Sequence, residues 1–178
     1  SEMAGVQPKR AVPERAFGDA AGEGVFQRAA APVVDDLLSQ FGDLRFGVMS
    51  ADSSARLTFI RSGHRRLQAR FDRVGGVPGL SLAEEHCGTN TVGTVLETRA
   101  PIALHGDEHF LECFKIFSGV GEPVIHPVTR RIEGIVSISC EQENNSPLLR
   151  PLLALAAREI EGRLVEMGRA VHGRLLAE

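Results

Sequence analysis

The most regular pattern of apolar and polar residues lies near the C-terminus of the chain. Apolar residues recur there every three or four positions, which is the period of an α-helix; they are Leu153, Ala156, Ile160, Leu164, Met167, Val171 and Leu175. Pro151 is tolerated in the first turn of a helix and disrupts its interior, so we expect the helix to begin near Pro151. At about 1.5 Å per residue it would reach roughly 40 Å. We therefore expect its far end to leave the core and to contact a second copy of the chain or a downstream domain.

The first half of the chain has shorter patterns. Apolar residues at helical spacing precede Gly42 and predict a helix that ends there; they are Val33, Val34, Leu37, Leu38 and Phe41. Two strand candidates, residues 46–50 and 57–60, flank the turn-like sequence ADSSA and predict a hairpin. The sequence GHRRLQARFDRVGG then predicts a short basic helix that ends at Gly75. Its arginines favour a solvated helix face over a phosphate site, because aromatic residues and a wider basic surface are missing.

The pattern from residue 89 to residue 140 predicts one longer helix and three strands. Residues 89–98 have the helical period, and strands are expected over residues 101–105, 120–126 and 132–140. The motif GDEHFLECF predicts a short helix between the first two of these strands. In the last strand apolar and polar residues alternate, which predicts a half-buried antiparallel strand; the residues on its expected inner face are Ile132, Gly134, Val136, Ile138 and Cys140. Antiparallel strands with flanking helices define the α+β class.

Length and composition bound the organisation of the chain. Its 178 residues fit one domain with a little left over, and 43% of them are hydrophobic. Residues 1–25 are rich in Ala, Gly, Pro, Glu and Arg without a period, and we expect them to form a flexible N-terminal arm. The folded domain is expected over residues 26–165, and residues 166–178 should continue the C-terminal helix.

Charge and cysteine content exclude several classes of protein. The net charge of −3 gives no reason to expect binding to nucleic acid or to an anionic membrane. No apolar run approaches the length of about 18 to 20 residues that spans a bilayer, and no signal peptide is visible. The three cysteines fit no disulfide framework, so we expect a cytoplasmic protein.

The stretch EEHCGTNTVG, residues 84–93, concentrates most of the residues that could perform chemistry. Glu84 and Glu85 are adjacent and would point in different directions, so they suit the start of a helix better than a pair of catalytic carboxylates. Thr89 or Asn90 would cap the helix that follows. The free N–H groups of the same turn would then be available to a polar group of a ligand.

Two alternatives involve the histidines and cysteines. Cys87 would lie near a helix N-terminus, which lowers the pKa of a thiol, so a thiol-dependent small-molecule reductase is the enzymatic alternative. We favour an unreactive thiol, because Cys113 looks like a core residue and Cys140 ends a strand. His86 and Cys87 could bind zinc or haem iron together with a second pair, His109 and Cys113, if these shared a helix face. The spacing is not that of a standard zinc site, so structural histidines are the preferred interpretation.

Two motifs carry a resemblance to a known family. EEHCGTNTVGT and GDEHF, followed by the hairpin EPVIHPVTRRIEGIVSISC, resemble the GAF sensor domain of bacterial transcriptional activators of the acetoin-catabolism-regulator type. The resemblance covers most of the chain, from about residue 29 to residue 165. It implies the GAF fold, with a central antiparallel sheet flanked by helices and a long C-terminal helix. It also implies a sensor that binds a small organic effector in a mostly apolar pocket, and no enzyme.

The resemblance further implies how such a domain is used. In this family the sensor precedes an ATPase module, a Fis-type helix-turn-helix, or both, and this chain has the motifs of neither. We therefore expect contact with DNA only through an output domain outside this chain, signalling through the C-terminal helix, and a homodimer formed by that helix. No catalytic residue, metal or cofactor is expected, and no contact with a membrane.

The ligand is expected against the central sheet, near residues 84–94 and the segment that carries His109. The sequence departs from the family pattern at four positions, where the family has an aromatic residue, a Trp, a Cys and a small apolar residue; here they are Leu82, Phe117, Gly119 and Glu122. These departures mean that the effectors of the family are not transferred to this chain. The candidate ligand-binding residues are Glu85, His86, Thr89, Asn90, His109, Phe110, Phe117 and Glu122.

Overall fold

A five-stranded antiparallel sheet forms the centre of the structure, which is a computed structural model that describes residues 11–19 and 24–177. The strand order across the sheet is β2-β1-β5-β4-β3. The chain therefore forms two antiparallel hairpins, β1–β2 and β4–β5, which are joined side by side through β1 and β5. The strands are β1 (Gly47–Asp52), β2 (Leu57–Ser62), β3 (Ile102–His105), β4 (Phe117–Ile125) and β5 (Ile132–Glu141).

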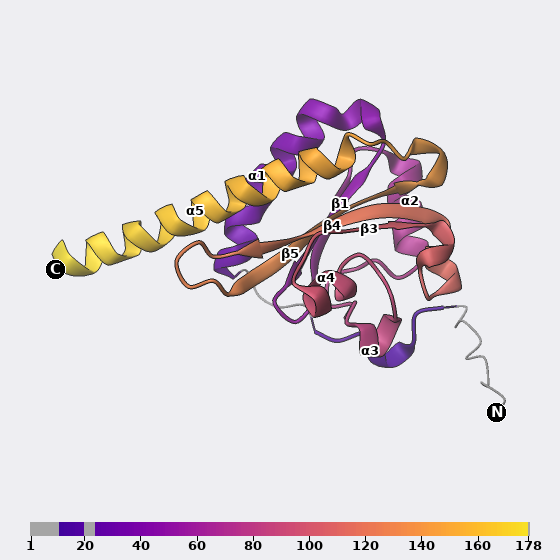
Figure 1. The fold of residues 1–178 in the computed structure, drawn as a ribbon, viewed down its shortest axis with the longest axis horizontal. Coiled ribbons are helices and arrows are strands. Elements are labelled where there is room, and N and C mark those ends of the chain that lie inside the picture. The colour runs from indigo at the N-terminus through magenta and orange to yellow at the C-terminus, as the bar shows by residue number, and fades with distance from the viewer. Residues whose placement is uncertain (1–10, 20–23, 178) are drawn as a thin grey trace.

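Helices cover both faces of this sheet (Figure 1). Helices α1 (Val25–Phe41) and α5 (Leu149–Ala177) pack together on one face. The other face is covered by α2 (Arg65–Arg73), the single turn α3 (Glu84–Cys87), the short α4 (Gly93–Thr98) and the loops between them. Two hydrophobic cores follow from this arrangement, one on each side of the sheet. The α+β class and the central antiparallel sheet flanked by helices are confirmed.

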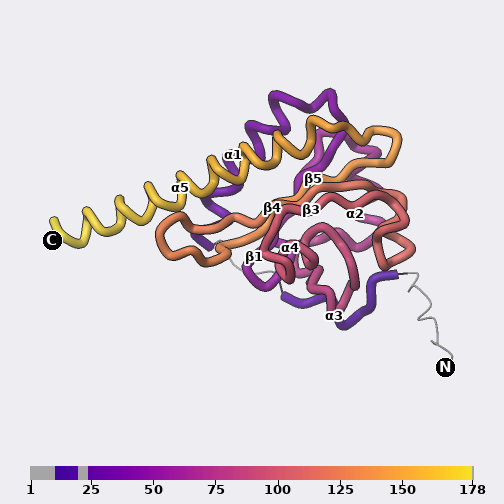
Figure 2. The backbone as a smooth tube through the Cα atoms, in the orientation of Figure 1, coloured from indigo at the N-terminus to yellow at the C-terminus, as the bar shows by residue number. Residues whose placement is uncertain are grey.

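Helix α5 is the feature that the sequence predicts most accurately. It begins at Leu149, so that Pro151 lies in its first turn, and Leu153, Ile160 and Leu164 are buried against the sheet and α1. Beyond that point the helix leaves the body of the domain, as the yellow end of the chain shows in Figures 1 and 2. The stripe continues there without a cover, and the side chain of Leu175 is 68% exposed.

The helix expected before Gly42, the hairpin expected from residues 46–50 and 57–60, and the short basic helix are present as α1, the β1–β2 hairpin and α2. The expectation of a half-buried last strand is wrong. Strand β5 lies between β1 and β4, and its residues 134–141 are all buried. Its polar positions do not face water, because helices also cover that side; the Ser137 hydroxyl, for example, donates to the carbonyl of Val120 at 2.9 Å.

Three short segments differ from their predictions. The helix expected over residues 89–98 begins only at Gly93, because the preceding residues form a turn held by side-chain hydrogen bonds. The motif GDEHFLECF forms two separate 3-10 helices, Gly106–Glu108 and Glu112–Phe114, rather than one helix. His109 and Cys113 therefore do not share a helix face. In the N-terminal segment, Glu14–Ala16 form another 3-10 helix and Ala16 is buried, whereas residues 1–10 and 20–23 of the expected arm lie outside the described part of the chain.

No helix within residues 11–19 and 24–177 is both long and apolar enough to span a lipid bilayer.

Candidate functional site

A small cavity lies between the sheet and the segments that cover its second face. Its volume is about 50 Å³, measured as the room for the centres of water molecules. The described residues that line it include no Asp, Glu, Lys or Arg. The wall is mostly apolar, and four side chains bring polar atoms to it. The apolar residues are Met49, Leu57, Ile60, Phe71, Val74, Leu80, Leu82, Phe114 and Phe117, with Gly76; the polar residues are Asn90, Thr91, His109 and Ser139.

Asn90 holds the loop that forms one wall of the cavity. Its amide nitrogen donates to the carbonyl of Leu82 at 2.7 Å and to that of Gly88 at 2.9 Å. Its side-chain oxygen accepts from the backbone N–H groups of Val92 at 3.0 Å and Gly93 at 2.9 Å, where α4 begins. This satisfies free N–H groups at the start of the helix, as a capping side chain does. All four hydrogen-bonding positions of the amide are thus occupied by the protein itself.

Glu84 connects the two short helices of the same segment. The carboxylate lies in the first turn of α3, and its Oε1 accepts a hydrogen bond from the hydroxyl of Thr94 on α4 at 2.6 Å. The backbone N–H of Asn90 in turn donates to the Thr94 hydroxyl oxygen at 3.3 Å. Glu84 is therefore a structural residue of the turn, and it bonds a hydroxyl rather than the end of a longer helix.

His109 is the buried titratable group of the cavity. Its Nδ1 lies 3.0 Å from the carbonyl oxygen of Gly106, and the edge of its ring packs near Phe114 with 6.3 Å between the ring centres. Burial lowers the pKa of the imidazole, and this effect outweighs the hydrogen bond to Gly106 and the charge of Glu108, which act in the opposite direction. The ring is therefore neutral at neutral pH and can serve as a hydrogen-bonding group without bringing a charge into the cavity.

Of the residues that the sequence predicts for the site, the structure brings Asn90, His109 and Phe117 to the cavity. Glu85 is exposed, and Nδ1 of His86 is bonded to the hydroxyl of Ser81 at 2.8 Å. Thr89 does not line the cavity either; its carbonyl accepts from the N–H of Phe110 at 3.1 Å.

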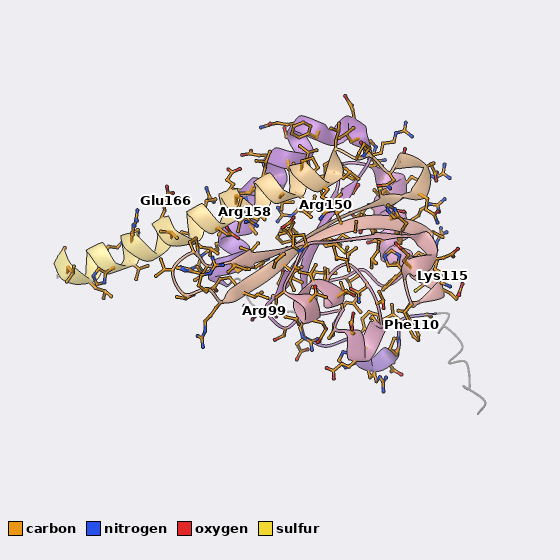
Figure 3. All side chains as sticks on the ribbon, in the orientation of Figure 1. Arg99, Phe110, Lys115, Arg150, Arg158 and Glu166 are labelled. Atoms are coloured by element: carbon orange, nitrogen blue, oxygen red, sulfur yellow. The ribbon has the colours of Figure 1, made fainter. Side chains whose placement is uncertain are left out.

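Phe110 and Glu122 are also outside the cavity, for different reasons. Phe110 packs against Gly88, whose positive φ of 62° and lack of a side chain leave room for the ring; Figure 3 labels this residue near α3. Glu122 lies on β4 but faces α5 on the other side of the sheet, because alternate residues of a strand face opposite sides.

Several lining residues are missed by reasoning from the sequence. Thr91 lies within the EEHCGTNTVG stretch but carries no distinctive chemistry of its own. Ser139 is a polar residue of β5, the strand in which apolar and polar residues alternate. The alternation alone predicts that its side chain is exposed, because it does not reveal that β5 lies at the buried centre of the sheet. The local sequence carries no signal that would have identified it, because the alternation along β5 is that of a half-buried strand.

The cysteines do not have the environment of reactive thiols. Cys87 is the last residue of α3 rather than the first residue of a helix, and it is completely buried. Burial, with a smaller contribution from Cys113, raises the pKa of Cys87 to about 12. The expected lowering by a helix N-terminus is therefore wrong. Within residues 11–19 and 24–177 there is also no group of three or more His, Cys, Asp or Glu side chains placed to hold a metal ion.

Solved structures with the same arrangement of elements define the fold as that of a GAF domain. The GAF domain/HD domain protein from Geobacter sulfurreducens aligns with a TM-score of 0.53 at 10% identity, covering 83% of this chain and 95% of that one. A higher TM-score of 0.76, at 17% identity, is found for the E. coli DhaR(N)–DhaL complex, with 95% of this chain and 60% of that chain covered. The expected fold is thus confirmed. The chain belongs to the family described as MimR, N-terminal domain, whose model matches residues 5–162.

Curated relatives are bacterial transcriptional activators. The chain is 32% identical over 148 residues to the propane 2-monooxygenase operon transcriptional activator MimR of Mycolicibacterium smegmatis. It is 26% identical over 144 residues to the acetoin dehydrogenase operon transcriptional activator AcoR of Bacillus subtilis. These alignments cover 83% and 81% of this chain but only 25% and 24% of the relatives. The chain thus spans about a quarter of the length of the activators that it matches, and its family is regulatory.

Proposed function

We propose that this domain is the effector sensor of a bacterial transcriptional regulator, and that its cavity binds a small, neutral organic molecule. The observation that carries the proposal is the composition of the cavity wall, which is apolar over most of its area and has no charged side chain among the described residues. A small-molecule site typically has such a wall together with a few placed polar groups. Asn90 shapes this wall, while Thr91, His109 and Ser139 supply polar atoms.

The size and charge of the cavity limit the ligand. A cavity of about 50 Å³ has room for a small molecule only. Burying a carboxylate or an ammonium group without a charged partner is very unfavourable. A small ligand with no charge fits both limits. The names of two relatives refer to propane 2-monooxygenase and acetoin dehydrogenase, which are enzymes named for small uncharged molecules.

Strand β4 offers the shortest connection from the cavity to α5. Phe117 lines the cavity from one face of this strand, and Glu122 contacts α5 from the other. The carboxylate of Glu161 on α5 accepts from the backbone N–H of Ile125 at 3.0 Å, which ties the helix directly to the strand. A ligand that shifts β4 by a small distance would therefore change the position of α5. A shift between two packed arrangements is a common way to transmit binding to an output domain.

The projecting end of α5 would pass the signal to a DNA-binding output domain outside this chain. The projecting part of α5 presents Val171 and Leu175 to solvent, with exposed fractions of 58% and 68%. A single helix of this length is marginal in water without packing, and we assign this surface to a homodimer of the cytoplasmic regulator. DNA contact would come from a downstream domain. Sedimentation of the purified chain over a range of concentrations tests the dimer, which is wrong if the chain remains a monomer throughout.

A thiol-dependent reductase is disfavoured by the same geometry. Its nucleophile would be Cys87, whose burial and raised pKa keep it protonated and out of reach of a substrate. A metal or haem sensor would need convergent ligands, whereas His86 and His109 are each bonded to protein oxygen atoms. No specific observation favours either alternative.

A thermal-shift screen with matched ligands tests the proposed function. 1-Propanol, propanoate and propylammonium have similar sizes and differ in charge. We expect the neutral ligand alone to raise the unfolding midpoint of the wild-type chain relative to a Ser139→Val variant, in which the added methyl groups occupy part of the cavity. Equal midpoint changes in the two proteins with every neutral ligand of this size would contradict a site in this cavity.

A further inference from the structure

The protonation of His109 is fixed by its hydrogen bond. Its Nδ1 lies 3.0 Å from the carbonyl oxygen of Gly106, and a carbonyl oxygen can only accept, so Nδ1 carries the hydrogen. In the neutral ring the other nitrogen, Nε2, then has a lone pair and no hydrogen. Within the described residues, Nδ1 to Gly106 is the side-chain hydrogen bond that His109 makes. Nε2 is therefore a hydrogen-bond acceptor that is left for a molecule in the cavity that the ring lines.

Toward a ligand, the hydroxyl of Thr91 can also only accept a hydrogen bond. Ser137 donates its single hydroxyl hydrogen to the carbonyl of Val120 at 2.9 Å. The contact of 2.8 Å between the hydroxyls of Thr91 and Ser137 must then use the hydrogen of Thr91. Only lone pairs of Thr91 remain for a ligand.

Ser139 is the remaining polar side chain of the cavity, since the amide of Asn90 is saturated. Its hydroxyl has no hydrogen-bond partner within residues 11–19 and 24–177. It can rotate to donate to an oxygen atom of a ligand. The cavity thus offers one group that can donate or accept, the Ser139 hydroxyl, and two that can only accept, Nε2 of His109 and the Thr91 hydroxyl, and these two require a hydrogen that the ligand must supply.

We propose that His109 is a specificity-determining residue, which accepts a hydrogen bond from the effector and makes the cavity prefer an alcohol to the ketone with the same carbon skeleton. This inference rests on the proposed function. An alcohol donates to Nε2 of His109 while its oxygen accepts from Ser139. A ketone accepts from Ser139 in the same way but leaves Nε2 without a partner. Because leaving a buried acceptor unpaired is costly, we expect the dissociation constant of the ketone to be higher by about tenfold or more.

The test compares 2-propanol with acetone, which have the same four non-hydrogen atoms and nearly the same shape. Because the chain has no Trp and no Tyr, binding is followed by amide chemical shifts of the ¹⁵N-labelled chain. The expected result is saturable binding of both ligands, with 2-propanol tighter by about tenfold or more. Equal affinities, or tighter binding of acetone, would overturn the assignment of His109 and leave the effector site standing. Saturable binding of neither ligand would overturn both proposals.

Two variants separate the roles of the polar groups. His109→Phe removes Nε2, and the backbone N–H of residue 109 still bonds the carbonyl of Gly106 at 3.1 Å, so that oxygen keeps a partner. In this variant the difference between the two ligands should fall to less than about twofold, which corresponds to a loss of the discriminating hydrogen bond. Ser139→Ala should weaken both ligands by a similar factor and keep the preference for 2-propanol. A preference for 2-propanol over acetone that survives in His109→Phe would overturn the inference. If that variant does not fold, the comparison of the two ligands on the wild-type chain decides the question.

Discussion

The guanidinium of Arg158 on α5 lies 3.6 Å from the carboxylate of Glu122 on β4, and this pair joins the projecting helix to the strand beside the cavity. The same arginine is 3.3 Å from Glu161, whose carboxylate also accepts the N–H of Ile125. Figure 3 shows Arg158 on the part of α5 that lies over the sheet, with Glu166 further out along the helix. The contact between α5 and the sheet is thus polar at this point, in the middle of an otherwise apolar interface.

Arg158→Ala should destabilise the domain even though Arg158 itself is largely exposed. The Glu122 side chain is only 5% exposed and its Oε2 has no hydrogen-bond partner among the described residues, so removal of the arginine leaves a buried carboxylate without its nearest positive charge. We expect a loss of about 1–2 kcal/mol in the free energy of unfolding, measured by urea denaturation. Arg169→Ala, at an exposed position of the same helix, is the control and should change it little. Equal losses of unfolding free energy in the two variants would show that the contact between Arg158 and Glu122 does not stabilise the domain.

Glu122→Gln should change how stability depends on pH. Burial raises the pKa of Glu122 above its ordinary value of 4.5, although the charges of Arg158 and Arg150 act against this. Between 4.5 and the raised value, the folded chain keeps a proton that the unfolded chain has lost, so this group makes stability fall as the pH rises. The glutamine variant lacks this dependence. Its free energy of unfolding relative to the wild type should therefore increase as the pH rises through this range and then level off. A difference that is constant with pH would contradict the burial of a titrating group.

Asn90→Ala should be among the more damaging substitutions of a polar residue. It removes two donated and two accepted hydrogen bonds and leaves buried carbonyl and N–H groups unpaired, so we expect a loss of about 2–4 kcal/mol in the free energy of unfolding. Asn90→Asp should be no better, because a carboxylate oxygen would then face the carbonyls of Leu82 and Gly88. Asn145→Ala, at an exposed position, provides the comparison. Stability of Asn90→Asp close to that of the wild type would show that the amide donors are not needed.

The three cysteines should react with a thiol reagent in an order set by their burial. Cys87 and Cys140 are buried, and burial raises their pKa values to about 12 and about 11. Cys113 is only partly buried, so it should account for the first phase of labelling in the native chain at neutral pH. Cys113→Ser should remove that phase and leave the other two thiols to react at the rate of unfolding. Rapid labelling of Cys87 in Cys113→Ser would reopen the reductase alternative.

The long, regular elements could be predicted because their patterns are repeated many times. Residues 153–164 repeat the helical stripe of α5, and the alternation along β5 identifies a strand whatever its position in the sheet. The short elements could not be predicted in the same way. The turn at Glu84–Cys87 and the 3-10 helices beside His109 are each about one turn long, so tertiary contacts rather than sequence period decide their form.

The candidate site was predicted only in part, for a related reason. Asn90, His109 and Phe117, which the sequence predicts for the site, line the cavity, whereas Glu122, which it also predicts, faces α5. A residue-by-residue resemblance does not reveal which face of a strand is the wall of a cavity. The position of β5 at the centre of the sheet, which brings Ser139 to the cavity, depends on strand order and has no signature in the local sequence.

The proposed effector site is tested by an amide chemical-shift titration of the ¹⁵N-labelled chain with small neutral alcohols and ketones, repeated on Ser139→Val. We expect saturable shifts at residues that line the cavity, together with shifts on α5 around Arg158 and Glu161, and the loss of both sets in the variant. Saturable shifts at the cavity without any response on α5 would contradict the proposed relay. Shifts that are the same in wild type and Ser139→Val, or no saturable shifts at all, would contradict the proposal that this cavity is the effector site.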